Sequence, residues 1–157
     1  MSNRKSQRDF VDSEETDLSL EQLSQLLWLA YGPNRDNKYK TVPSACADFP
    51  FDVYVFLRKG VYKYTYNQLE LITARDWRAI TGTQDFVAKA NVNIVLVGDK
   101  DKETQGPTEA YKKMMIDWDS GFVAQNMALY CADQNLKCVP RAMFVESGIL
   151  GVLQLSS

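Results

Sequence analysis

Residues 19–32 carry the clearest helical pattern in the chain. Apolar side chains recur there at the three- and four-residue intervals of one helix face, namely Leu20, Leu23, Leu27 and Ala30. Ser19 followed three residues later by Gln22 is the sequence of a capping box, and Gly32 before Pro33 is a stop signal. The pattern predicts one amphipathic helix that begins after Ser19 and ends at Gly32.

The hydrophobic pattern changes to a period of two in residues 52–72, DVYVFLRKGVYKYTYNQLELI. Val53 and Val55 alternate with Tyr54, so both faces of this segment are apolar or aromatic and suit a covered strand. The Lys-Gly pair at 59–60 predicts a turn, after which tyrosines alternate with smaller or polar residues. The stretch therefore predicts two or three strands joined as hairpins.

Further along, NIVLVGD at 93–99 is a continuous apolar run and predicts a strand buried on both faces. A helical pattern then extends from Pro107 to Asn135. At about 1.5 Å per residue this helix is long enough to cross the whole domain. CVPRAMFV at 138–145 predicts a last short strand, and SGILGVLQLSS at 147–157 predicts a short helix or a tail.

The remaining segments predict short or irregular structure: loops over 34–50, a short helix over 74–82 and a turn or short helix over 83–90. Helices mixed with strands, without a regular βαβ rhythm, indicate the α+β class. The length of 157 residues suits one domain, 1–157, with a sizeable core.

Composition narrows the classes of function. The formal net charge of −2 argues against a nucleic-acid partner, because such proteins usually carry a basic surplus. No apolar run reaches the roughly 18 residues of a membrane span, and the polar start lacks the apolar core of a secretory signal. Three cysteines without CxxC spacing, Cys46, Cys131 and Cys138, indicate free thiols and a cytoplasmic location.

The chain contains no histidine. That excludes a Ser-His-Asp or Cys-His catalytic unit and a histidine-containing zinc site, and we predict no metal site. If the protein is an enzyme, its chemistry must come from a cofactor or from carboxylate, Lys, Tyr or Cys side chains.

The segment RKSQR places Arg4, Ser6 and Arg8 at two-residue spacing, beside Lys5. In an extended chain such positions project from one face at intervals of about 6.6–6.8 Å. Two guanidinium groups and a hydroxyl on one face suit a phosphate and its attached polyol. The alternative is a frayed, solvated basic tail.

Five segments, taken in order along nearly the whole chain, resemble the FMN-dependent nitroreductase family, and its small bacterial and SagB-type dehydrogenase members in particular: NRKSQRDF, LSQLLWLAYGPNR, TVPSA, VYVFL..GVYKYTYNQLEL and DSGFVAQNMALYCADQNL. The resemblance implies a mixed, mainly antiparallel sheet flanked by helices, with a long central helix. It also implies a homodimer with FMN at each of two subunit interfaces.

The resemblance further implies roles for single residues. The FMN phosphate and ribityl chain would be gripped by Arg4, Lys5, Ser6 and Arg8. Three consecutive residues from the partner subunit, Pro43, Ser44 and Ala45, would line the flavin ring, although Ser44 could instead only cap a turn.

Two more positions follow from the resemblance. Gln84 corresponds to the residue that bonds the pyrimidine edge of the flavin, or is simply the first polar residue of a short helix. The segment Pro140, Arg141 and Ala142 would run past flavin N5 through its backbone amides, with a solvated charge as the alternative reading of Arg141.

Residues of the long helix are assigned to packing and dimer contact rather than catalysis: Asp119, Gly121, Gln125 and Asn126. The three tryptophans, Trp28, Trp77 and Trp118, are expected in the core or an interface. The chain departs from the family pattern in three ways. It starts almost on the RxSxR motif, it has Ala142 where glycine is frequent, and it ends at GVLQLSS, before the family's last strand.

Three functions remain open. The first is an FMN-dependent oxidoreductase in which NAD(P)H reduces the flavin and a nitroaromatic, quinone or similar small molecule takes the electrons by a ping-pong mechanism, with no catalytic side chain. The second is a non-catalytic flavin-binding or storage protein. The third is an interaction module without a cofactor, against which the ordered presence of both arginines and Ser6 argues.

Overall fold

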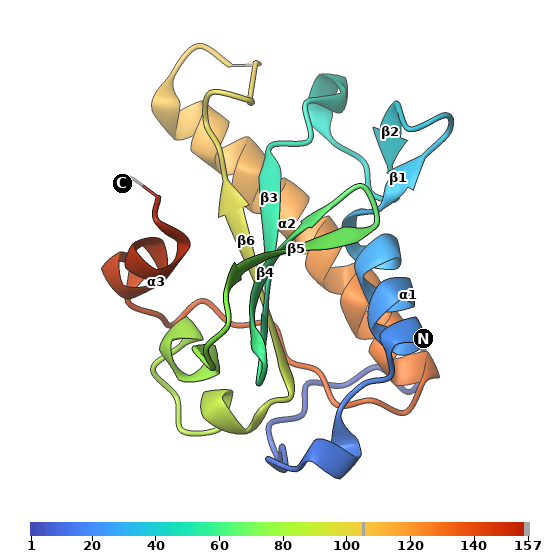
Figure 1. Ribbon diagram of the computed structural model, residues 1–157. Helices are drawn as coiled ribbons and strands as arrows, with labels where there is room; N and C mark the ends of the chain where they lie inside the picture. The colour runs from blue at the N-terminus through green and yellow to red at the C-terminus, as the bar shows by residue number, and fades with distance from the viewer. Residues whose placement is uncertain (105, 156–157) are drawn as a thin grey trace.

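The computed structural model describes residues 1–104 and 106–155. Its main sheet is antiparallel, with the strand order β5-β4-β3-β6 (Figure 1). The strands are β3 (Phe51–Leu57), β4 (Gly60–Thr65), β5 (Gln68–Thr73) and β6 (Val92–Gly98). A separate small pairing joins β1 (Pro33–Asn34) to β2 (Tyr39–Lys40) inside the predicted loop region.

Three α-helices cover the sheet: α1 (Leu20–Tyr31), α2 (Glu109–Asp133) and α3 (Glu146–Leu153). The described residues also form four short 3-10 turns: η1 (Glu14–Thr16), η2 (Ala45–Ala47), η3 (Arg78–Thr81) and η4 (Val87–Lys89). None of the helices in the described part of the chain is long and apolar enough to cross a membrane. The predicted α+β class and the long central helix are confirmed.

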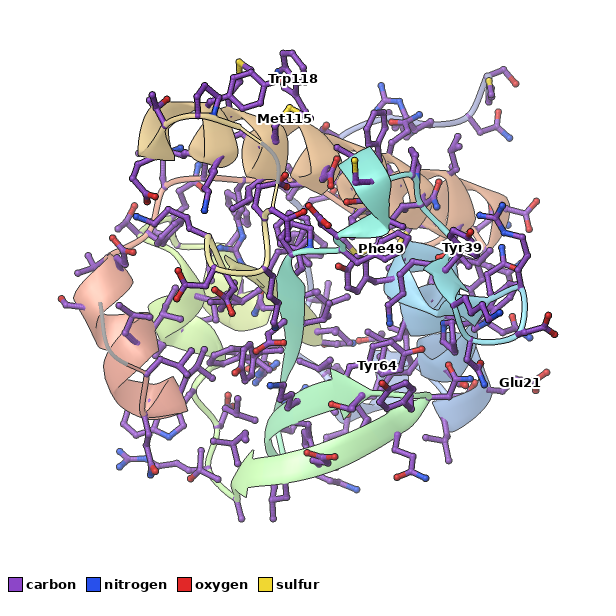
Figure 2. The ribbon with its side chains drawn as sticks, turned by 90° about the horizontal axis from the view of Figure 1, so that it is seen from above. Glu21, Tyr39, Phe49, Tyr64, Met115 and Trp118 are labelled. Atoms are coloured by element: carbon purple, nitrogen blue, oxygen red, sulfur yellow. The ribbon has the colours of Figure 1, made fainter. Side chains whose placement is uncertain are left out.

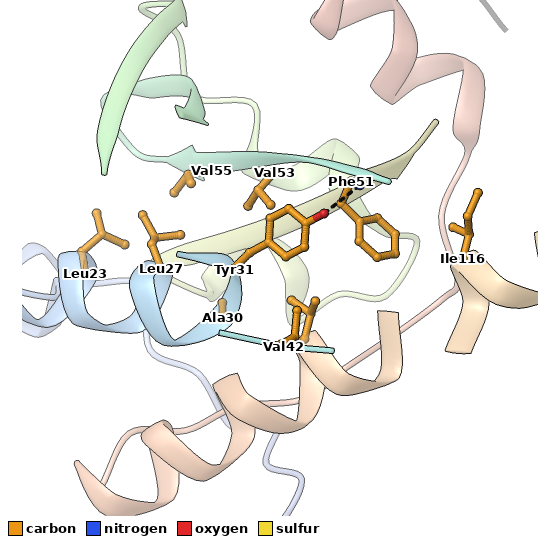
Figure 3. Packing of buried hydrophobic residues seen from close by; sticks show 10 residues of the cluster. Leu23, Leu27, Ala30, Tyr31, Val42, Phe51, Val53, Val55 and Ile116 are labelled. Carbon is orange, nitrogen blue, oxygen red and sulfur yellow. Dashed lines mark hydrogen bonds between the residues drawn. The ribbon is translucent and has the colours of Figure 1, made fainter. Parts of the chain in front are cut away.

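The alternation along β3 explains the layers. Val53 and Val55 point to the core shared with α1 and α2, where they meet Leu27 (Figure 3). Tyr54 and Phe56 point to the opposite face, where they pack with the side chains of α3. Because successive strand residues face opposite sides, one apolar strand supports a helical layer on each face of the sheet.

Helix α1 forms as its pattern predicts. The Ser19 hydroxyl accepts the Gln22 N–H at 3.1 Å, and the Gln22 amide oxygen accepts the Ser19 N–H at 3.0 Å, which completes the capping box. At the other end, the Tyr31 hydroxyl accepts the backbone N–H of Phe51 at 3.1 Å, the bond dashed in Figure 3. This bond joins the helix directly to the start of β3.

One element prediction is confirmed only in part and one is wrong. Strand β6 packs on both faces, with Ile94 and Leu96 against the cluster of α1 and α2 and with Val95 and Val97 against the cluster of α3, but only its Asn93 is fully buried. Its second edge pairs with no strand among the described residues. The segment 138–145 forms no strand, since it joins no sheet ladder in the described chain. The helix predicted after it exists as α3, and residues 156–157 of that prediction lie outside the described residues.

Candidate functional site

The N-terminal segment lies against the chain that follows α2. The Gln7 N–H donates to the Cys138 carbonyl at 3.0 Å. Lys137 Nζ reaches both the Asp9 carbonyl, at 2.6 Å, and the Asp9 carboxylate, at 2.7 Å. This hydrogen bond from Lys137 holds the pKa of Asp9 below its ordinary value. The segment is therefore fastened to the rest of the chain from Gln7 onward.

A second attachment follows at Asp12. Its carboxylate accepts from Arg58 at 2.6 Å and from Arg78 at 3.2 Å, and the bond from Arg58 is the main cause of its lowered pKa. Phe10 packs on Phe86 with 6.0 Å between ring centroids. These contacts leave the predicted phosphate-binding side chains exposed to solvent: Arg4, Lys5, Ser6 and Arg8.

The segment Pro140–Ala142 is held by the side chain of Arg141. Its guanidinium donates to the carbonyl and hydroxyl of Thr81, the latter at 3.0 Å, and to Asn93 Oδ1 at 2.5 Å. Burial lowers the pKa of Arg141. Arg141 is thus not a solvated charge. The backbone N–H groups of Arg141 and Ala142 have no protein acceptor within residues 1–104 and 106–155.

Gln84 lies beside the same segment, because its neighbour Thr83 donates a backbone hydrogen bond to the Met143 carbonyl at 3.1 Å. The Gln84 amide oxygen is buried and has no hydrogen-bond partner in the described chain. A buried acceptor without a donor is costly, so such an atom suits a position that a ligand completes. Gln84 precedes η4, whose N-cap is Phe86, and it does not cap the turn with its side chain.

Pro43, Ser44 and Ala45 lie elsewhere, beside the middle of α2. The Ser44 hydroxyl accepts the Phe49 N–H at 3.0 Å and lies close to the Asp119 carboxylate. Asp119 is only 4 % exposed and its Oδ2 atom has no partner among the described residues. Burial raises the pKa of Asp119.

A cleft of about 1230 Å³ runs along the free edge of β6, between that strand, α2 and the segment that follows α2. Its walls include Phe10, Thr81, Cys138, Arg141 and Ala142. The structure therefore brings the N-terminal segment, Gln84 and Pro140–Ala142 to one region, and leaves the Ser44 loop apart from them.

Sequence reasoning missed the groups that position this region. Asn93 is 4 % exposed and accepts from Arg141, while its own amide donates to the Val87 carbonyl at 3.1 Å. The signal was present, because Asn93 lies between Val92 and the apolar run 94–97, and a polar side chain there needs buried partners. The contact between Asp119 and Ser44 had no comparable signal, since the two residues are far apart in sequence.

The outer side of α2 carries large exposed apolar side chains. Trp118 is 59 % exposed and Phe122 is also exposed, and in Figure 2 Trp118 and Met115 lie on the side of α2 away from the sheet. Nothing lies within 4 Å of a Cβ placed on Gly121. The opposite side of the helix packs on α1, where Asn126 Nδ2 donates to the Leu29 carbonyl at 2.9 Å. The predicted packing role of Asn126 is confirmed.

The layered fold and the family match below identify an oxidoreductase of the nitroreductase type. The sequence model of the Nitroreductase family matches residues 1–157, and the chain belongs to that family. It is 28 % identical over 164 residues to a protein of Methanocaldococcus jannaschii named as a nitroreductase, covering 97 % of this chain and 81 % of that one.

Solved structures agree with this assignment. A protein of Ralstonia eutropha described as a nitroreductase superposes with a TM-score of 0.87 at 34 % identity, over 99 % of this chain and 73 % of that chain. The Escherichia coli microcin synthetase complex McbBCD, solved with truncated pro-MccB17 bound, contains a chain with the same fold. That chain matches with a TM-score of 0.78 at 19 % identity, over 99 % of this chain and 66 % of its own length.

Proposed function

We propose that this chain is an FMN-dependent oxidoreductase that passes electrons from NAD(P)H to a nitroaromatic, a quinone or a similar small molecule by a ping-pong mechanism. The observation that carries the proposal is the hydrogen bond from Gln7 to Cys138. This bond joins the N-terminal segment, which carries the cationic side chains, to the segment Pro140–Ala142, which has backbone N–H groups without a protein acceptor. The first suits the phosphate end of a flavin nucleotide and the second suits its ring.

The residues present fit FMN at this place. Arg4, Arg8 and Ser6 offer exposed donors for the phosphate and ribityl groups. The buried amide oxygen of Gln84 lacks a partner in the described chain and suits an N–H on the pyrimidine edge. Bound FMN supplies the centre that accepts a hydride and passes electrons on.

In this proposal, the protein's own residues bind the flavin and orient it. Arg141 fixes the segment Pro140–Ala142 through Thr81 and Asn93, so that its free N–H groups present fixed dipoles. Such preorganised donors stabilise negative charge that develops on a bound group. No catalytic side chain is required by this proposal, and protons can come from water.

We also propose that the protein is a homodimer, with the Ser44 loop of one protomer lining the flavin of the other. The exposed apolar side of α2 at Trp118 and Phe122 supports this part of the proposal. A cytoplasmic location, where thiols stay reduced, is supported by the three free cysteines.

The test compares the chain with the double variant Arg4→Ala/Arg8→Ala by titration calorimetry with FMN. Charge-assisted hydrogen bonds contribute about 1.5–3 kcal/mol each, so the Kd should rise at least tenfold. Arg75→Ala is the matched control, because Arg75 is exposed and contacts only the Trp77 ring in the contacts described. An unchanged Kd in the double variant would remove the N-terminal segment from the site.

Turnover is measured separately, as NADH or NADPH oxidation by the FMN-loaded protein with a quinone or nitroaromatic acceptor. Parallel lines in double-reciprocal plots are the ping-pong result. FMN binding without turnover would assign the protein to flavin storage instead. A protein that stays colourless after incubation with FMN would contradict both functions.

A further inference from the structure

Two cysteines lie together where α2 ends. Cys131 is in the last turns of the helix and is 6 % exposed, while Cys138 is half-buried in the segment that follows. The chain reverses between them, since the Leu136 N–H donates to the Cys131 carbonyl at 2.7 Å and Asn135 has a φ of 54°. Both cysteines pack in one apolar cluster with Tyr130, and both line the cleft.

The two thiols are chemically different. The two thiols pack in the same cluster, and their interaction raises the pKa of Cys131 and lowers the pKa of Cys138. Burial opposes the shift at Cys138, and the positive charge of Arg4 adds to it. Cys138 is therefore the better nucleophile of the two, with Cys131 held beside it.

We propose that Cys131 and Cys138 form a redox modification site that hydroperoxides convert to a disulfide within one chain. Two thiols packed in one cluster at the wall of a cleft are the arrangement that such a reaction needs. Cys46 is the internal contrast, because it is exposed on η2 and is not part of the cluster that holds the other two.

The reaction balances with hydrogen peroxide as the oxidant. The Cys138 thiolate attacks one peroxide oxygen, the O–O bond breaks, and the leaving hydroxide takes up a proton to become water. The product is a sulfenic acid on Cys138. The Cys131 sulfur then attacks the Cys138 sulfur, the S–O bond breaks, and a second water leaves with the Cys131 proton. Two thiols are oxidised by two electrons, and one peroxide is reduced to two waters.

The position of Cys138 means that a disulfide would affect the proposed FMN-binding segments. Cys138 accepts the Gln7 N–H through its carbonyl and lies two residues before Pro140. A disulfide to α2 would fasten the junction between the segments proposed to bind the phosphate and the ring of FMN. This consequence rests on the proposed function, whereas the disulfide itself can be measured on protein without flavin.

The experiment uses the chain reduced with dithiothreitol, freed of reductant and exposed to a small molar excess of hydrogen peroxide. Free thiols are then alkylated and the protein is digested with trypsin. Cleavage after Lys113, Lys137 and Arg141 places the two cysteines on separate peptides. We expect a linked pair of peptides 114–137 and 138–141, with Cys46 still free and the link reversed by dithiothreitol.

Three variants make the outcome decisive. Cys46→Ser should form the link as the unaltered chain does. Cys131→Ser should leave Cys138 as a sulfenic acid that dimedone traps on peptide 138–141. Cys138→Ser should abolish both the link and the trapped adduct. Recovery of both peptides fully alkylated after peroxide, or a link that needs Cys46, would overturn the proposal, whatever the protein's affinity for FMN.

Discussion

Gln84 combines two properties that a purely structural residue would not combine. Its amide oxygen is buried without a partner in the described chain, and it lies next to the segment held by Arg141. Leaving a buried acceptor unpaired costs about 1–3 kcal/mol, so the protein without ligand carries a local penalty. A ligand donor at this atom would remove that penalty on binding.

We therefore expect Gln84→Leu, which replaces the amide with an apolar group of similar size, to act in opposite directions on stability and on binding. The Tm of the flavin-free protein should rise by roughly 2–4 °C, and the Kd for FMN should rise about tenfold. Calorimetric unfolding and FMN titration measure the two effects. A lower Tm would mean that the amide is already satisfied in the protein.

Asp119 gives a pH-dependent prediction. Burial raises its pKa in the folded protein above the ordinary 3.8, so the folded state holds the proton more tightly than the unfolded state. Below pH 3.8 the group is protonated in both states and has no effect. As pH rises through the folded pKa, the buried carboxylate loses its proton and the protein loses stability.

Asp119→Asn removes this titration while its amide oxygen can still accept a bond from Ser44. The Tm of the variant should exceed that of the unaltered chain at pH 7, and the difference should shrink as pH falls toward 4. Asp117→Asn is the control on the same helix, since Asp117 is exposed and paired with Lys113 at 2.7 Å. A Tm difference that does not vary with pH would contradict the assignment.

At the scale of elements, local pattern predicted α1, α2 and a run of two or three strands, which the structure forms as β3, β4 and β5. Each of these carries its own signal, such as the capping box at Ser19 or the alternation at Val53–Val55. Strand β6 was predicted as a strand, but its place at the edge of the sheet was not predicted. An apolar run indicates that the faces of a strand are buried, whereas the order of strands in a sheet depends on tertiary contacts.

The segment 138–145 was predicted as a strand and forms none. Its composition favours a strand, but Pro140 has no N–H to donate to a neighbouring strand, and the edge of β6 lines the cleft. The segment is fixed instead by contacts with residues far away in sequence: its Cys138 and Met143 carbonyls accept backbone N–H groups, and Arg141 donates to Thr81 and Asn93. No local pattern in the chain predicts such a contact.

Because the Arg141 guanidinium makes the buried side-chain hydrogen bonds of this segment, Arg141→Ala should lower stability by about 2 kcal/mol, or roughly 4–8 °C in Tm. The loss follows from leaving the Asn93 amide oxygen without its donor. Arg141→Lys should recover only part of the stability, because an ammonium does not present the fork that reaches both acceptors. Unfolding followed by circular dichroism measures the series, and equal Tm values for all three proteins would contradict it.

At the scale of the molecule, α2 has three separate uses. One side packs on α1 and the sheet, a second lines the cleft, and a third leaves Trp118 and Phe122 in solvent. The loop with Ser44 is attached to the same helix through Asp119, the residue after Trp118. A partner that covers the third side would therefore be close to the loop proposed to line its flavin.

This arrangement predicts that dimerisation and flavin affinity fail together. A buried tryptophan at an interface typically contributes 2 kcal/mol or more, so Trp118→Lys should weaken the dimer roughly 30-fold, as sedimentation velocity would detect at micromolar concentration. The same variant should bind FMN less tightly, because the Ser44 loop of the partner is lost.

Leu71→Lys is the matched control, since Leu71 is 57 % exposed on β5, away from α2, and should change neither property. If Trp118→Lys remained dimeric, the contact would lie elsewhere. If it became monomeric with an unchanged FMN Kd, each protomer would bind the flavin alone, and the shared site would be wrong.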